Sequence, residues 1–319
     1  MLSRVAESIY WMSRYIERAE NYARFIDVNL NLAMDLPHDH PEQWEPLVMT
    51  TGDVALYEKY YRGYGRSDVI RFLTTDVMNP NSILCCLEKA RENARTVREM
   101  IPQGMWMQIN ELYLWVKDSV TYNVPQQENV AEFYRRVKLG AQLFYGIRDE
   151  TYSREDGWHF SNLGALLERA DKTARIIDMK YYYLLPTPEH VGTPLDLLQW
   201  SALLNSAGAY EMYRKFYGTL DIDKIIDFLI FNRTFPRAIL YCLMSADTSL
   251  RTLTGGEDMR FSNAAEKQMG LVVSKLMYGD ALEISDYGLH EYMDHFQQEL
   301  NSVTEAIYDT FFASKEMRP

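Results

Sequence analysis

The chain has 319 residues, of which 47% are hydrophobic and 24% are charged, and it contains only 11 Pro and 16 Gly. This length and composition predict a globular protein of one large or two ordinary domains, with long regular segments and few breaks. A net charge of −12 argues against a general affinity for nucleic acid or for anionic membranes, because both attract basic surfaces.

The cysteines and the N-terminal segment indicate the compartment. Cys85, Cys86 and Cys242 lie in apolar stretches, which favours reduced core thiols over a disulfide framework or a metal knuckle. Arg4 and Glu7 interrupt what would have to be the apolar part of a secretory signal. No uninterrupted apolar run approaches the roughly 20 residues that span a bilayer. We therefore expect a cytoplasmic protein with no membrane partner.

A regular helical seam opens the chain. Apolar residues recur at spacings of three and four from Val5 to Leu30, which predicts a long helix over residues 3–35. The same apolar spacing returns 151 positions later, between Phe160 and Tyr181. The apolar pattern of this helix therefore occurs twice in the sequence.

The charged residues beside the seam repeat with it. The matched sets are Glu17-Arg18-Ala19-Glu20 with Glu168-Arg169-Ala170-Asp171, Arg24 with Arg175, and Asp27 with Asp178. Farther along the chain the offset becomes 156, and it pairs Trp44 with Trp200, Gly52 with Gly208, Tyr57 with Tyr213, Pro80 with Pro236, and Cys86 with Cys242. An internal match of this length predicts duplication. We expect one domain, 1–319, made of two repeats at approximately 1–125 and 126–319.

The apolar periodicity predicts helices throughout, and no strand pattern competes with it. The expected helices span residues 3–35, 41–62, 66–77, 80–101, 105–119, 127–153, 159–185, 195–217, 221–232, 236–253, 260–279 and 286–313. Asn79 and Thr193 each precede a proline and are predicted helix caps. The predicted fold is all-α: a duplicated multi-helix bundle about an approximate two-fold axis, with the two Glu-Arg helices in the centre.

A charged stripe lies beside the seam in each copy. Its members are Glu17, Glu20, Arg24 and Asp27 in the first copy, and Glu168, Asp171, Arg175 and Asp178 in the second. Charges that flank a packed seam are partly desolvated, so they must pair with each other or with a bound molecule. In the structural interpretation, ion pairs fix the register of two central helices, with Glu20 to Arg24 and Asp171 to Arg175 in the favourable i,i+4 order.

The functional interpretation places the Glu-Arg pairs in one cavity. Glu17, Arg18, Glu168 and Arg169 are then the catalytic candidates. Their arginines would bind a carboxylate or phosphate, and their glutamates would accept a proton or bind an amine. The candidate binding residues around them are Glu20, Arg24, Asp27, Asp171, Arg175 and Asp178.

Metal and cofactor motifs receive little support. A di-iron or dimanganese bundle site uses Glu-x-x-His pairs, and this pattern does not occur in the chain. His290 and His295 miss the zinc-protease spacing by one residue, and His38 and His40 lie in a proline-flanked loop, so we interpret all four as ordinary surface residues. Walker, Gly-x-Gly-x-x-Gly and Gly-x-Ser-x-Gly motifs are also missing from the sequence. We expect no metal and no cofactor.

Five segments of the chain form a recognisable set: Met1-Leu2-Ser3-Arg4-Val5-Ala6-Glu7, Tyr10-Trp11-Met12-Ser13-Arg14-Tyr15, Glu17-Arg18-Ala19-Glu20, Gly157-Trp158-His159-Phe160 and Leu167-Glu168-Arg169-Ala170-Asp171. Together they resemble the bacterial α-E domain family, and the resemblance covers nearly the whole chain. The resemblance implies a helical domain that accompanies, or is fused to, circularly permuted ATP-grasp ligases and transglutaminase-like peptidases. It also implies an accessory role in bacterial systems that make or trim peptide-type amide bonds.

Two functions are therefore expected to compete. The first is a non-catalytic helical scaffold that partners an ATP-grasp ligase, with a transglutaminase-like peptidase as a further partner and a peptide as the presented substrate. One or two of the rings of Tyr181, Tyr182 and Tyr183 would face a partner. The second is an enzyme in which the paired Glu and Arg residues act on an amide or amino-acid substrate.

Overall fold

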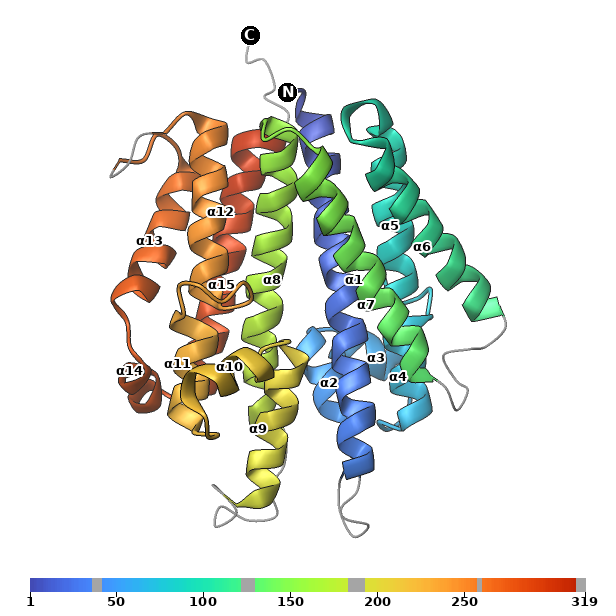
Figure 1. Cartoon of the computed structure of the whole chain (residues 1–319), viewed down its shortest axis with the longest axis vertical. Coiled ribbons are helices and arrows are strands. Elements are labelled where there is room, and N and C mark those ends of the chain that lie inside the picture. Colours follow the sequence, from blue (N-terminus) through green and yellow to red (C-terminus); the bar gives the residue numbers. More distant parts are fainter. Residues whose placement is uncertain (36–41, 122–129, 183–192, 257–259, 314–319) are drawn as a thin grey trace.

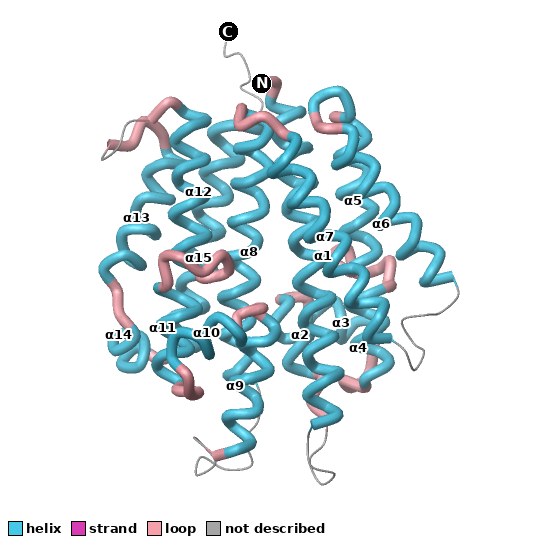
Figure 2. Tube along the Cα trace, viewed as in Figure 1, coloured by secondary structure: helices cyan, strands magenta, loops and turns pink. Residues whose placement is uncertain are grey.

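The computed structural model describes residues 1–35, 42–121, 130–182, 193–256 and 260–313. These residues form helices joined by turns and loops, with no strand among them (Figure 2), so the predicted all-α class is confirmed. The helices are α1 (Ser3–Asp35), α2 (Glu45–Thr51), α3 (Val54–Tyr60), α4 (Arg66–Thr74), α5 (Ile83–Thr96), α6 (Gln103–Thr121), α7 (Val130–Thr151), α8 (Asp156–Tyr182), α9 (Pro194–Ser206), α10 (Tyr210–Tyr217), α11 (Ile222–Phe231), α12 (Ile239–Thr254), α13 (Ala264–Tyr278), α14 (Ala281–Tyr287) and α15 (Leu289–Ile307). None of them is both long enough and apolar enough to cross a bilayer.

The two Glu-Arg helices, α1 and α8, lie side by side in the centre of the molecule (Figure 1). Helices α5 and α7 pack against α1, and α6 covers both of them, while α12 and α15 pack against α8 and α13 covers those two. The helix that follows each central helix crosses to the other one, so that α2 contacts α8 and α9 contacts α1. Each half of the chain thus contributes to the environment of the other half's central helix.

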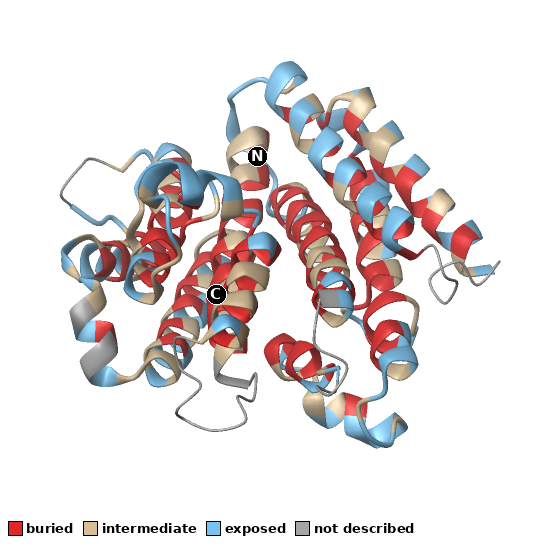
Figure 3. Ribbon diagram, turned by 60° about the horizontal axis from the view of Figure 1, so that its bottom comes forward, coloured by how far each residue is buried: buried red, intermediate tan, exposed pale blue. Residues whose placement is uncertain are grey.

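The apolar seam of α1 is the face of the helix that is buried by this packing. Ile9, Met12, Ile16, Ala23 and Ile26 all have 0% exposure, and they are the residues that the spacing of three and four places on one face. The buried positions of both central helices form one continuous core (Figure 3). The sequence periodicity therefore identified the inward face of α1 correctly.

Helices α1 and α8 run parallel and come closest near their N-terminal ends. The hydroxyl oxygens of Ser13 and Ser161 are 2.7 Å apart. A Cβ atom at Gly164 would lie 2.3 Å from the backbone oxygen of Tyr10, which is closer than real Cβ contacts allow. Glycine at this position lets the two backbones approach, and the approach brings the charged residues one turn farther along within reach of each other.

Two predicted helices are each split in the structure. Residues 41–62 and 195–217 were expected to form single helices, but the first divides into α2 and α3 and the second into α9 and α10. The chain turns at Gly52 (φ +76°) and at Gly208 (φ +62°), in the left-handed region that glycine adopts without a steric penalty. The matched glycines are helix terminators, and the prediction of continuous helices was wrong.

Other helix starts and ends also differ from the predictions. Asn79 does not cap a helix, because α5 begins at Ile83 with Ser82 as its cap, and Asn79 instead donates to the Phe72 carbonyl. The helix expected at 236–253 begins three residues later. The helix expected at 286–313 is preceded by α14, begins after Gly288 (φ +102°) and closes in a π-helical turn, Tyr308–Phe312. Thr193 is the N-cap residue of α9 before Pro194, as predicted, but its side chain makes no capping hydrogen bond to the helix.

The duplication itself and its approximate two-fold axis stay predictions. The boundary proposed near residues 125 and 126 lies outside the described residues, as do His38, His40 and Tyr183. The structure does show contacts between the two central helices in which residues that correspond in the two sequence segments bind corresponding partners.

A test of the helix crossing is the change Gly164→Ala. Because the new methyl group would meet the Tyr10 carbonyl, we expect a loss of about 1–3 kcal/mol in the free energy of unfolding, measured by urea denaturation. Gly146→Ala is the matched control, since Gly146 lies in α7 with nothing within 4 Å of its added Cβ, and this change should stabilise the protein by up to about 1 kcal/mol. Equal effects of the two changes would contradict the proposed close approach.

Candidate functional site

Glu17 lies on the inward side of α1 and is fully buried. Arg169 of α8 donates two parallel hydrogen bonds to its carboxylate, from Nε to Oε1 at 3.0 Å and from Nη2 to Oε2 at 2.9 Å. Arg237, in the turn before α12, donates from Nη1 to Oε1 at 3.1 Å, and Asn21 donates to the same oxygen at 3.1 Å. Both carboxylate oxygens of Glu17 are therefore occupied by protein donors.

Glu168 occupies the corresponding place on α8 and is equally buried. Arg18 of α1 donates from Nε to Oε1 at 2.6 Å and from Nη2 to Oε2 at 3.0 Å. Arg14 adds a bond of 2.9 Å to Oε2, and the Lys172 ammonium lies 3.4 Å from Oε1. Three cations thus surround one carboxylate.

The two sets of contacts are reciprocal. Each glutamate of a Glu-Arg pair is bound bidentately by the arginine of the other pair, across the interface between α1 and α8. We call Glu17, Arg18, Glu168 and Arg169 the Glu-Arg clasp. A planar guanidinium matches the two oxygens of a carboxylate, so this geometry fixes both distance and orientation between the helices.

The pairing keeps both glutamates ionised. Burial by itself raises the pKa of Glu17, but the positive charges of Arg169 and Arg237 outweigh it and lower the pKa to about 2. The pKa of Glu168 is likewise lowered well below its usual value, because Arg18, Lys172 and Arg14 outweigh the burial. A carboxylate with so low a pKa is a poor general base near neutral pH.

The next members of the stripe form the predicted pairs within each helix. Arg24 Nη2 lies 2.6 Å from Glu20 Oε1, and Arg175 Nε lies 3.0 Å from Asp171 Oδ2. Glu20 Oε1 also accepts from Arg237 at 2.9 Å, whereas its Oε2 is buried and, within the described part of the chain, has no hydrogen-bond partner. The i,i+4 pairs of the structural interpretation are confirmed.

Both of these arginines also reach the turn at the end of the helix that follows the other central helix. Arg175 Nη1 donates to the Thr50 carbonyl at 3.0 Å and lies 3.2 Å from where a Cβ of Gly52 would be. Arg24 Nη1 lies 3.0 Å from the corresponding point at Gly208. The matched glycines therefore provide space for matched arginines as well as ending their helices.

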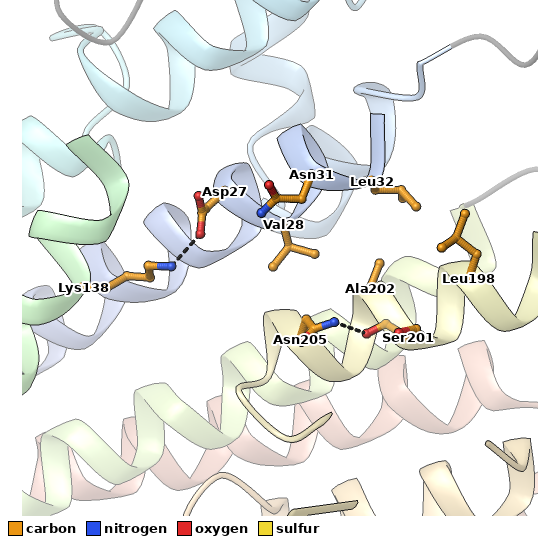
Figure 4. A pocket seen from close by; sticks show the side chains of 9 residues that line it. All are labelled: Asp27, Val28, Asn31, Leu32, Lys138, Leu198, Ser201, Ala202 and Asn205. Atoms are coloured by element: carbon orange, nitrogen blue, oxygen red, sulfur yellow. Dashed lines mark hydrogen bonds and ion pairs between the residues drawn. The ribbon is translucent and has the colours of Figure 1, made fainter. Parts of the chain in front are cut away.

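The last pair of stripe residues does not join this group. Asp27 binds Lys138 of α7, with 2.5 Å between Oδ2 and Nζ, and Asp178 binds His290 of α15, with 2.6 Å between Oδ1 and Nδ1. Asp27 and Lys138 line a pocket of about 340 Å³ between α1 and α9, and Val28, Asn31 and Asn205 also contribute to its wall (Figure 4). Burial raises the pKa of Asp178, although His290 partly offsets this.

Sequence reasoning found the clasp but missed several of its partners. Arg14 lies one helical turn before Arg18, and Lys172 lies one turn after Glu168, so helical spacing could have indicated both. Arg237 lies 220 residues from Glu17, and no local pattern pointed to it. Its only signal was the repeat alignment, which places it opposite Asn81.

The arrangement favours the structural interpretation of the clasp. Both glutamates have 0% exposure, and their carboxylate oxygens are already paired with guanidinium and ammonium groups of the protein. A catalytic carboxylate, by contrast, needs access to substrate. The arginines are different, because the side chains of Arg18 and Arg169 keep 15% and 17% exposure. Among the described residues, no three His, Cys, Asp or Glu side chains gather as a metal site would require.

Comparisons with known proteins support the same family. The family model named Alpha-E, described as a predicted alpha-helical domain with a conserved ER motif, matches residues 1–312. An uncharacterized protein of Mycobacterium bovis and one from each of two strains of Mycobacterium tuberculosis are 23% identical to the chain over 269 residues. The match covers 79% of this chain but only 30% of each relative. No solved structure matches.

Replacing Glu17 by Gln tests the structural interpretation of the clasp. The change would leave Arg169 and Arg237 buried without full compensation, and we expect a loss on the order of 3–5 kcal/mol in the free energy of unfolding. Glu168→Gln should behave alike. Glu132→Gln is the control, because Glu132 pairs with Arg135 on the surface and its loss should leave the urea midpoint unchanged. Full stability of the Glu17 variant would favour a functional role instead.

The low pKa of Glu17 also predicts how stability depends on pH. Its folded pKa of about 2 lies below its ordinary value of 4.5, so the unfolded chain takes up the proton first as the pH falls. The contribution of this group, about 3 kcal/mol, is complete above about pH 5 and is lost between about pH 4.5 and 2. In urea unfolding the wild type and Glu17→Gln should therefore converge in stability on acidification. A constant difference between them from about pH 7 to about pH 3 would contradict this assignment.

Proposed function

Because this chain belongs to the Alpha-E family of helical domains with a conserved ER motif, we propose that it is a non-catalytic partner of an ATP-grasp-type ligase. In this role it scaffolds the ligase during the synthesis or modification of peptide-type amide bonds. A transglutaminase-like peptidase is the second proposed partner, and a peptide is the proposed molecule to be presented. The observation that carries the proposal is the closed Glu-Arg clasp.

The clasp supports the proposed scaffold role because the charged residues of the ER motif bind each other within the protein and not a substrate. Buried, bidentate pairs between α1 and α8 fix one relative position of the two helices, and rigid elements present a surface more accurately than mobile ones. The enzyme alternative requires Glu17 or Glu168 to reach a substrate. That would first require breaking ion pairs to two or three cations, which weighs against it.

The relatives support a role beside other domains. The chain spans about 30% of the length of the mycobacterial proteins that it matches, so in those proteins the helical domain lies within a much longer polypeptide. A helical domain that is joined to a much longer stretch of polypeptide can hold a neighbouring domain in position. We propose that the neighbour is the ligase.

A suitable contact surface lies on α6 and α7. Leu139 and Leu143 occupy successive turns of α7 and are 47% and 53% exposed. Together with Trp115 of α6 they line a hollow of about 190 Å³, and the Arg136 guanidinium covers the Trp115 ring at 4.3 Å. Exposed apolar side chains that cluster in this way are typical of protein contact sites.

The test is co-expression with the ATP-grasp ligase encoded beside, or fused to, this domain in its host. We expect the two proteins to co-elute in size-exclusion chromatography at physiological salt. The double change Leu139→Glu and Leu143→Glu should abolish co-elution without lowering the melting temperature, because both side chains face solvent.

Leu271→Glu provides the matched control. Leu271 is also an exposed leucine, 58% accessible, but it lies on α13 on the other side of the molecule, and its replacement should leave the complex intact. Separate elution of wild-type protein and folded ligase would contradict the proposed partnership. Loss of the complex in the Leu271 variant alone would move the contact to α13.

A further inference from the structure

A second pocket, of about 480 Å³, opens between the C-terminal end of α7, the first half of α8, and α12. Three arginines contribute to its wall: Arg148, Arg154 and Arg169. Its size lies within the range of small-molecule sites in proteins. The pocket includes one arginine of the clasp but neither of the clasp glutamates.

Arg148 brings an incompletely compensated guanidinium to this wall. The residue is 6% exposed, and its Nε donates to Asp149 Oδ1 at 2.9 Å. Its Nη1 is buried and has no hydrogen-bond partner in the described part of the chain. Because this nitrogen is closed to solvent and donates to none of the described residues, the charge of Arg148 is only partly compensated, and a negative charge in the pocket would be favoured.

Arg169 brings a weakly bound donor, and the comparison with Arg18 shows why. Arg18 Nη1 donates to Asn81 Oδ1 at 2.6 Å, whereas Arg169 Nη1 has only a long contact, 3.5 Å, to the Pro236 carbonyl. The residue aligned with Asn81 is Arg237, which turns toward Glu17 and offers no acceptor. The two copies thus differ at the one position that would satisfy this nitrogen.

The local charge favours an anion. Arg148 and Arg154 both pair with a single carboxylate, Asp149, whose Oδ1 also accepts from Trp158 Nε1 at 3.3 Å. Burial raises the pKa of Asp149, but the hydrogen bond and charge of Arg148 outweigh it, so this carboxyl stays ionised. Two guanidiniums therefore share one negative charge at the pocket wall.

Aromatic rings hold these guanidiniums in position. The Trp158 ring lies 4.0 Å from the central carbon of Arg154 and 5.2 Å from that of Arg148. The Tyr145 ring lies 5.2 Å from Arg148 and 5.5 Å from Arg169, so these two arginines pack against the same side chain. This packing limits the entropy that would be lost when a ligand orders them.

We propose that the pocket lined by Arg148, Arg154, Trp158 and Arg169 binds the carboxylate group of a small molecule or of a short peptide. A carboxylate oxygen accepts a hydrogen bond from Nη1 of Arg169, and the positive charges of Arg148 and Arg154 attract the anion. This binding activity goes beyond the proposed scaffold role and does not depend on it.

A carboxylate fits the wall better than a phosphate does. The excess positive charge is small, and Asp149 lies in the same wall, where it would repel a dianion. Leu166, Pro236 and Tyr241 add apolar surface for the uncharged part of the ligand. A planar carboxylate also matches guanidinium donors directly.

The experiment is isothermal titration calorimetry of the full chain with N-acetyl-alanyl-alanine, its C-terminal amide and inorganic phosphate. We expect the free acid to bind at least about tenfold more tightly than the amide, because the amide lacks the charge-assisted hydrogen bonds. Phosphate should bind more weakly than the acid. Equal affinity of acid and amide, or tighter binding of phosphate, would overturn the proposal.

Two variants locate the site. Arg148→Gln removes one positive charge from the pocket wall, and it should weaken binding of the acid at least about tenfold. If this variant fails to fold, Thr248→Phe fills the pocket from its exposed rim on α12 and should abolish binding. Thr252→Phe is its matched control: both threonines donate to the carbonyl four residues earlier, but only Thr248 lines the pocket. Unchanged binding by Thr248→Phe would overturn the proposed location.

Discussion

Two carboxylates buried in the centre of an apolar bundle constrain the rest of this structure. An ionised group without compensation in such a place would cost several kcal/mol, so each must meet cations of matching geometry. Arg169 for Glu17 and Arg18 for Glu168 meet this requirement across the interface of α1 and α8. A slip of one residue between the helices would shift a side chain by about 1.5 Å and turn it by about 100°, which would separate both pairs at once. The clasp therefore selects one register.

The contacts around the clasp extend this register to the rest of the fold. Arg175 binds the carbonyl of Thr50 in α2, and Arg24 lies against Gly208 beyond α9, so each central helix holds the segment that follows the other one. Arg237 joins the start of α12 to Glu17 and Glu20 of α1. Short polar contacts thus connect segments that lie far apart in the sequence, while the apolar core supplies the bulk of the burial.

Sequence periodicity predicted much of this architecture, and its failures have physical causes. The seam from Ile9 to Ile26 follows directly from helical spacing, and the i,i+4 pairs follow from the same geometry. The break at Gly52 was missed because an isolated glycine gives no indication of its φ angle. Arg237 and His290 were missed because their partners are distant in the chain, and only the fold brings them together. The arginine pocket was missed because it combines residues of α7, α8 and α12.

The central claim is that the Glu-Arg clasp couples α1 to α8. A double-mutant cycle with Glu17→Gln, Arg169→Met and the combined variant measures this coupling in urea unfolding. We predict that the two changes are strongly non-additive, with a coupling free energy of about 2–3 kcal/mol, because the second change removes a charge that the first has left uncompensated. Additivity within about 0.5 kcal/mol would contradict the account, since it would mean that the two side chains stabilise the fold independently.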